Sequence, residues 1–121
     1  MLKLQIWKRD FELKVVYDCY SGEKASTTQK DSAKQFSSEA NSAIDESLKE
    51  VEKYCLEMNK EDIGSSQIDN IFKYVMPESI FVKRDGRVAI MCRYKFDSEH
   101  GIAVVFKDNK FEQIGMQDII L

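Results

Sequence analysis

The sequence predicts a single α+β domain over residues 1–121: an antiparallel sheet meander of about five strands, with one long and one or two short helices packed on one face. Three observations lead to this prediction. An alternating apolar run lies near the N-terminus, a helical period of three and four follows it, and two turn-forming pairs divide alternating runs after residue 78. At 121 residues and 43% apolar, the chain can bury a core without disulfides or metals.

The first predicted element is a strand in WKRDFELKVVYDCY. Its apolar residues alternate with charged ones, as is typical of a strand with one buried face: Phe11, Leu13, Val15 and Tyr17. SGEKAST then supplies a turn. Thr28 is followed three residues later by Asp31, which resembles a helix N-cap with an acid at the third position.

Residues from about 28 to 59 are predicted to be helical. SSEANS at 37–42 holds poor helix formers, so we expect a short helix to about Phe36, a break, and a longer helix to about Met58. Five apolar residues of the longer helix share one stripe that should pack on the sheet: Ile44, Leu48, Val51, Cys55 and Met58.

The remaining chain predicts a short helix and then hairpins. QIDNIFKYV fits a short helix that stops before Pro77, the only proline. Asp85-Gly86 and Asp108-Asn109 each divide two alternating runs, as expected for two-residue type I′ turns. Such loops set the register. The predicted pairs are Phe81 with Ile90, Val82 with Ala89, Phe106 with Phe111, and Val104 with Gln113.

This register assigns side chains to two sheet faces. The face that receives the helix collects Phe81, Val88, Ile90, Cys92, Tyr94 and Phe96. The opposite face holds Ile80, Val82, Met91, Ala103, Val105 and Ile114. If that second face were uncovered, copies of the chain could pair through it. A monomer is the favoured state.

Composition disfavours several classes of protein. The net charge of -3 argues against direct nucleic-acid binding, which needs a basic surface. MLKLQIW is too short for a signal-peptide core, and no run approaches the ~20 apolar residues of a membrane span, so we expect a cytoplasmic protein. Cys19, Cys55 and Cys92 lack the spacing of disulfide or zinc motifs. We expect no metal and no cofactor.

One segment raises the question of catalysis: FDSEHG, which contains the only histidine, His100. Asp97 can start a turn and Gly101 can take positive φ, so neither needs a chemical role. Glu99 and His100 have no such explanation. A single histidine does not make a zinc site. Cys92 in the preceding strand is the candidate nucleophile, but its place on the apolar stripe predicts that it is buried. The chain is therefore expected not to be an enzyme; the alternative is a small hydrolase or ligand-binding enzyme using Asp97, Glu99 and His100.

FDSEHGIAVVF, followed by IGMQD at 114–118, resembles small uncharacterised bacterial domains with an aromatic-Asp-Pro-Glu-His-Gly motif and a later Gly-x-Gln-Asp. Ser98 stands where that pattern has proline. The first half resembles them in layout: a strand, a Gln-containing helix start and a longer helix with KYC. Some such domains lie beside toxin genes as immunity proteins. The resemblance implies a cytoplasmic inhibitor that binds the cognate toxin domain of a contact-dependent or polymorphic toxin system.

Exposed acids would suit that role. Many delivered toxins are basic proteins such as nucleases, and an acidic surface complements them. The candidate partner-binding residues lie on the long helix and in the DSEHG turn: Asp45, Glu46, Glu50, Glu57, Asp97, Glu99 and His100.

Overall fold

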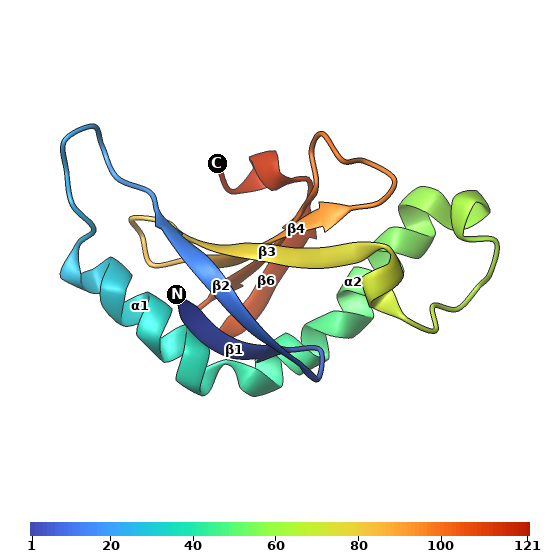
Figure 1. Cartoon of the computed structure of the whole chain (residues 1–121), viewed down its shortest axis with the longest axis horizontal. Helices are drawn as coiled ribbons and strands as arrows, with labels where there is room; N and C mark the ends of the chain where they lie inside the picture. Colours follow the sequence, from blue (N-terminus) through green and yellow to red (C-terminus); the bar gives the residue numbers. More distant parts are fainter.

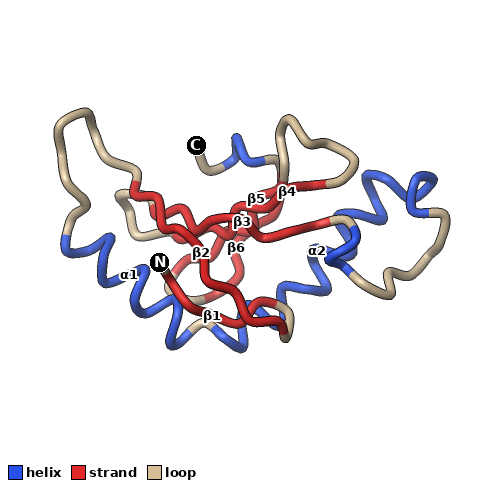
Figure 2. Tube along the Cα trace, viewed as in Figure 1, coloured by secondary structure: helices blue, strands red, loops and turns tan.

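A computed structural model describes residues 1–121 and confirms the α+β class. One open sheet has the order β1-β2-β3-β4-β5-β6, and α1 and α2 run along one of its faces (Figure 1, Figure 2). The strands are β1 (Leu2–Ile6), β2 (Arg9–Tyr17), β3 (Val75–Val82), β4 (Val88–Tyr94), β5 (Ile102–Lys107) and β6 (Lys110–Gly115). The helices are α1 (Thr27–Glu39) and α2 (Asn41–Ile63), with short 3₁₀ turns η1 (Ile71–Lys73) and η2 (Gln117–Ile119).

The first strand, β1, is an element that the sequence interpretation missed. It forms an antiparallel hairpin with β2. The turn residues Trp7 and Lys8 have φ of 50° and 69°, the left-handed conformation of a type I′ turn. Trp7 is nonetheless buried, and its Nε1 donates a hydrogen bond to Ser47 Oγ of α2 at 3.2 Å. The hairpin is thereby fixed to the long helix.

The strands β2 and β3 are parallel, whereas all other neighbouring strands are antiparallel. Val15 lies beside Ile80 and Tyr17 beside Val82. A parallel pair needs a long crossover because the chain must return to the end at which the first strand began. The two helices and η1 form this crossover, which the expectation of a purely antiparallel meander did not include.

The helix boundaries differ from the predicted ones at both ends. The N-cap of α1 is Ser26, which forms a capping box with Gln29; the predicted cap, Thr28 with Asp31, is wrong. The predicted break lies at Ala40. The helical geometry of α2 then runs to the predicted end at Met58, is interrupted by a kink at Asn59, and resumes to Ile63.

Four residues of the predicted helical stripe pack on the sheet as expected, and the fifth does not. Ile44, Val51 and Cys55 are buried, and Leu48 packs against the same core. Met58 is 61% exposed. The predicted short helix before Pro77 is reduced to η1, and β3 already includes that proline, next to an irregularity in the pairing with β4.

The predicted register of β3 and β4 is wrong by one residue. The backbone N–H of Lys83 donates to the Arg87 carbonyl, and that of Gly86, with φ of 91°, donates to the Lys83 carbonyl. This is a three-residue loop with glycine at its left-handed position, not a two-residue turn. The observed pairs are Ile80 with Ile90, Phe81 with Ala89, and Val82 with Val88.

The turn between β5 and β6 is the predicted one. Asp108 and Asn109 have φ of 51° and 63°, as a type I′ turn requires. A bulge one step away shifts the register beyond it. The observed pairs are Phe106 with Phe111, as predicted, Val105 with Gln113, and Val104 with Ile114.

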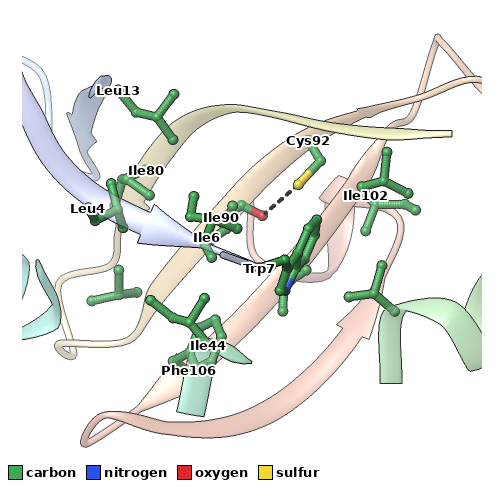
Figure 3. Close-up of a cluster of buried hydrophobic side chains, with 14 of the residues drawn as sticks. Leu4, Ile6, Trp7, Leu13, Ile44, Ile80, Ile90, Cys92, Ile102 and Phe106 are labelled. Atoms are coloured by element: carbon green, nitrogen blue, oxygen red, sulfur yellow. Dashed lines mark hydrogen bonds between the residues drawn. The ribbon is translucent and has the colours of Figure 1, made fainter. Parts of the chain in front are cut away.

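The one-residue shift exchanges side chains between the faces. Ile80 lies in the main core beneath the helices (Figure 3). Val82 belongs to the same core and Ile114 packs against it, so the assignment of these three residues to the opposite face is wrong. Phe81 conversely belongs to a small cluster on the opposite face. That cluster contains Ala89, Met91, Ala103, Val105 and Ile120. Ile120 is only 1% exposed, so the C-terminal segment covers part of the second face, whose exposure would have allowed copies of the chain to pair.

Gln29 is a buried polar side chain that joins α1 to the sheet. Only 2% of it is exposed. Its Nε2 donates to the carbonyls of Asp18, at 2.9 Å, and Val82, at 3.2 Å, which lie where β2 and β3 end. Its Oε1 accepts the backbone N–H of Ser26 at 3.0 Å. One side chain thus caps the helix and ties it to both parallel strands.

We expect Gln29→Ala to lower the free energy of unfolding by about 1–3 kcal/mol, because the substitution removes the capping box and leaves the Asp18 carbonyl without its donor, whereas the Val82 carbonyl keeps the backbone N–H of Asp18. Urea denaturation followed by circular dichroism would measure the change. Gln35→Ala is the matched control, since Gln35 is exposed on the same helix and should change stability by less than about 0.5 kcal/mol. Equal stability of the two variants would show that the Gln29 bonds contribute nothing net.

Candidate functional site

The DSEHG segment lies in the connection between β4 and β5, and Asp97 organises it. Asp97 Oδ1 accepts the backbone N–H of His100 at 3.2 Å, and the Asp97 carbonyl accepts the N–H of Gly101 at 2.9 Å. The His100 ring also bonds to this carboxylate, with Nδ1 3.0 Å from Oδ1 and 3.1 Å from Oδ2. The turn role expected for Asp97 is therefore observed, and the same carboxylate gives His100 the partner that the sequence did not indicate.

Gly101 and Gln117 join the two halves of the motif. Gly101 has φ of 61°, and a Cβ there would lie 2.6 Å from both the Cys92 carbonyl oxygen and Gln117 Nε2. Gln117 Nε2 donates to that carbonyl at 3.1 Å, and the backbone N–H of Gln117 donates to the His100 carbonyl at 3.2 Å. DSEHG and IGMQD thus pack as one unit, and close approach explains the glycine.

Asp97 and His100 each favour the charged form of the other, as their pKa shifts show. The pKa of Asp97 is lowered, mainly by the backbone N–H of His100 and then by its side chain. The pKa of His100 is raised, first by the hydrogen bond to Asp97 and then by that residue's charge, with smaller effects from Glu99 and Asp118. Half of the His100 side chain is exposed. This arrangement favours the protonated form of His100 in an acidic loop at the surface.

The two core thiols are not placed for nucleophilic chemistry with His100. Cys92 and Cys55 lie in the helix-side core, and Cys92 Sγ donates to the Ile90 carbonyl at 3.7 Å (Figure 3). Burial raises the pKa of Cys55 to about 11 and the pKa of Cys92 further above its ordinary range. A buried neutral thiol is a poor nucleophile. No group of three or more His, Cys, Asp or Glu side chains could hold a metal ion.

Three of the four predicted acids of α2 share one stripe. Glu46, Glu50 and Glu57 are exposed and four and seven residues apart, so this stripe lies opposite the core, whereas Asp45 lies about 100° around the helix from Glu46. Tyr54 lies between Glu50 and Glu57 in the sequence, on the flank of the helix where its ring packs against the core. Asp45 and Glu46 lie about 12 Å or more before Tyr54 along the helix axis, at 1.5 Å per residue.

Tyr54 connects the later part of α2 with the DSEHG loop. Its ring centroid is 6.3 Å from that of Tyr94 in β4. Its pKa is raised mainly by burial and further by the negative charges of Asp97 and Asp118, so both carboxylates act on the Tyr54 hydroxyl. Tyr94 itself donates to Asn59 Oδ1 at 2.7 Å, which holds the end of α2 beside β4.

We define an acidic surface around Tyr54 by its neighbours on α2, Glu50 and Glu57, and by Asp97, Glu99, His100 and Asp118 of the loop and η2. No hydrogen bond or ion pair joins the two groups of acids. Asp45 and Glu46 are placed apart from it. Tyr54 and Asp118 were missed as site residues, although KYC and IGMQD had been noted for the motif. No helix of the chain has the length and apolar character needed to cross a bilayer.

We expect Gly101→Ala to destabilise the fold by more than about 2 kcal/mol, because it adds a steric clash to the strain of a positive φ. Gly64→Ala separates the two effects. Gly64 has φ of 72° but open space around its Cβ position, so only the backbone strain of about 1 kcal/mol remains. Thermal unfolding of both variants tests this, and an equal loss would refute close packing of Gly101 on Gln117.

We expect the His100 imidazole to titrate above the ordinary pKa of about 6.5 and Asp97→Asn to remove that shift. NMR of the ring protons measures it directly. A raised pKa means that the histidine's contribution to stability is complete below about pH 6.5 and is lost as pH rises through the folded-state pKa. The lowered pKa of Asp97 gives a contribution present above about pH 3.9 and lost as pH falls. An unshifted His100 in the parent protein would contradict the ion pair.

The comparisons with known proteins identify a family and nothing further. No curated protein and no solved structure matches this chain. One family model matches, described as a domain of unknown function, DUF6985, and the match covers residues 1–121. The protein therefore belongs to the DUF6985 family.

Proposed function

We propose that this protein is an immunity protein that binds and neutralises a cognate toxin domain in the cytoplasm. The acidic surface around Tyr54 is the observation that supports this role. A tyrosine offers a large, stiff contact area and is enriched among residues that dominate binding energy at protein interfaces. Carboxylates from α2, the DSEHG loop and η2 flank it. An aromatic anchor within a charged rim suits a basic protein partner.

A nuclease toxin is the partner class that this surface fits best. Enzymes that act on nucleic acid carry positive charge around the substrate site, because they must neutralise phosphates. Carboxylates aimed at such a site increase the association rate and fix the orientation of the complex. The inhibitor would then occupy the toxin's substrate site without binding nucleic acid or performing any reaction itself.

A second candidate is a small hydrolase or ligand-binding enzyme, and the Asp97–His100 pair is the observation that favours it. A carboxylate bonded to Nδ1 orients the ring in the way that acid–base catalysts use. His100→Ala separates the two functions. An enzyme would lose turnover on hydrolase substrates with its melting temperature unchanged, whereas a binding protein would show no turnover before or after and a lower melting temperature.

We expect charge reversal at Glu50 and Glu57 to abolish protection against the toxin. The toxin segment to test is the C-terminal part encoded by the gene immediately upstream, co-expressed in a bacterial host. That segment alone should arrest growth, and the parent protein should restore growth and co-purify as a 1:1 complex. Glu50→Lys combined with Glu57→Lys should weaken the complex at least about tenfold, because repulsion replaces complementarity beside Tyr54.

Asp45→Lys combined with Glu46→Lys is the matched control. It makes the same change of charge on the same helix, but outside the acidic surface. Protection should survive this control with little loss of affinity. Equal loss in both double variants would leave only a general effect of charge, and the absence of both toxicity and complex formation would remove the proposal's support.

A further inference from the structure

A second charged surface lies at the other end of a row of aromatic rings. The row runs from Tyr54 to Tyr94, then to Phe96 with a centroid distance of 5.5 Å, and from Phe96 to Tyr74 with another 5.5 Å. Tyr74 belongs to a groove of about 290 Å³ whose lining includes Phe72, Lys73, Arg93 and Lys95. One row of contacting aromatic rings thus connects the acidic surface at Tyr54 with the basic groove at Tyr74.

Two cations in or beside this groove, Lys95 and Arg9, lie over aromatic rings. Lys95 Nζ lies 5.9 Å from the Tyr74 centroid and 6.0 Å from that of Phe96. The Arg9 guanidinium lies 5.1 Å from the centroid of Phe72, which lines the groove, and 5.5 Å from that of Phe11. A cation above a ring keeps its N–H donors available to other groups.

Few carboxylates neutralise these cations. Arg93 forms an ion pair with Glu78 at 3.7 Å, and both side chains are largely exposed. Arg9, Lys73 and Lys95 form no ion pair with any carboxylate of the chain. The groove therefore keeps a local positive charge in a protein whose net charge is -3.

We propose that this basic groove, defined by Arg9, Lys73, Arg93 and Lys95 with the rings beneath them, binds an acidic segment of a partner protein. Aspartate or glutamate carboxylates of that segment accept hydrogen bonds from Arg9, Lys73 and Lys95. The rings restrict Arg9 and Lys95 before binding, which reduces the entropy lost on association. The Arg9 guanidinium can bind a carboxylate through two parallel N–H donors. This surface is separate from the acidic one and does not rest on toxin binding.

An acidic peptide fits the groove better than a nucleic acid does. Base stacking needs free aromatic faces. Here Arg9 lies over Phe72, and Tyr74 and Phe96 stack on each other with an interplanar angle of 26°. Glu78 lies beside Arg93 and would repel a continuous phosphate backbone. A peptide can present its carboxylates at separate positions and avoid this repulsion.

The test uses the full chain and a fluorescently labelled Asp/Glu-rich peptide, with binding followed by anisotropy at low salt. We expect saturable binding that salt weakens, and Lys73→Ala combined with Lys95→Ala should lower affinity about tenfold. Lys30→Ala combined with Lys34→Ala on α1 is the matched control and should bind as the parent does. Circular dichroism would confirm that both double variants are folded.

Three results would overturn the proposal. They are no saturable binding of the peptide, equal loss of affinity in both double variants, and tighter binding of an oligouridylate of the same length. The last would identify a nucleic-acid surface instead. Amide chemical shifts provide a second measurement on the parent protein: the peptide should perturb Phe72, Tyr74 and Phe96 and leave the α1 residues unchanged.

Discussion

The parallel pairing of β2 with β3 is the constraint on which the rest of the structure depends. Because the chain leaves β2 at one end of the sheet and enters β3 at the other, the crossover must span the sheet's full length, and α1 and α2 do so together. The break at Ala40 lets each helix contact its own part of the sheet. In α1 the Phe36 ring packs on that of Phe106 with a centroid distance of 5.1 Å, and in α2 Ser47 accepts the hydrogen bond from Trp7. Gln29 fixes the crossover where it begins, at the ends of both strands.

The path of α2 in turn creates the candidate site. Its last turns lie beside the end of β4, where Asn59 departs from helical geometry, with φ of -138°, and accepts the hydroxyl of Tyr94. This contact places Tyr54 against Tyr94 and next to the loop that follows β4. Gln117 holds that loop from the other side through the Cys92 carbonyl. The acidic surface is thus built from three segments that the crossover and the C-terminal turn bring together.

Local patterns could predict the elements whose signals are local. The apolar period placed α2, and Asp108-Asn109 marked the last turn correctly. The hairpin of β1 and β2 was not predicted, because its turn residues, Trp7 and Lys8, take left-handed conformations that such residues rarely adopt. An Asp-Gly pair is compatible with a hairpin loop of two or three residues. The sequence therefore left the pairing of β3 with β4 uncertain by one residue. For the site, the turn role of Asp97 was predictable, whereas the contacts of Tyr54 join distant segments and no local pattern encodes them.

The net charge of -3 describes neither binding surface. At physiological salt a charge acts over about 8 Å, so a partner at contact distance meets the local side chains rather than the sum over the chain. A sum near zero is compatible with an acidic surface around Tyr54 and a basic groove around Tyr74 on one aromatic row. The net charge therefore disfavours nucleic acid only as an average over the whole surface. Folding gathers Arg9, Lys73 and Lys95 from distant positions, and their combined charge can attract what the average would repel.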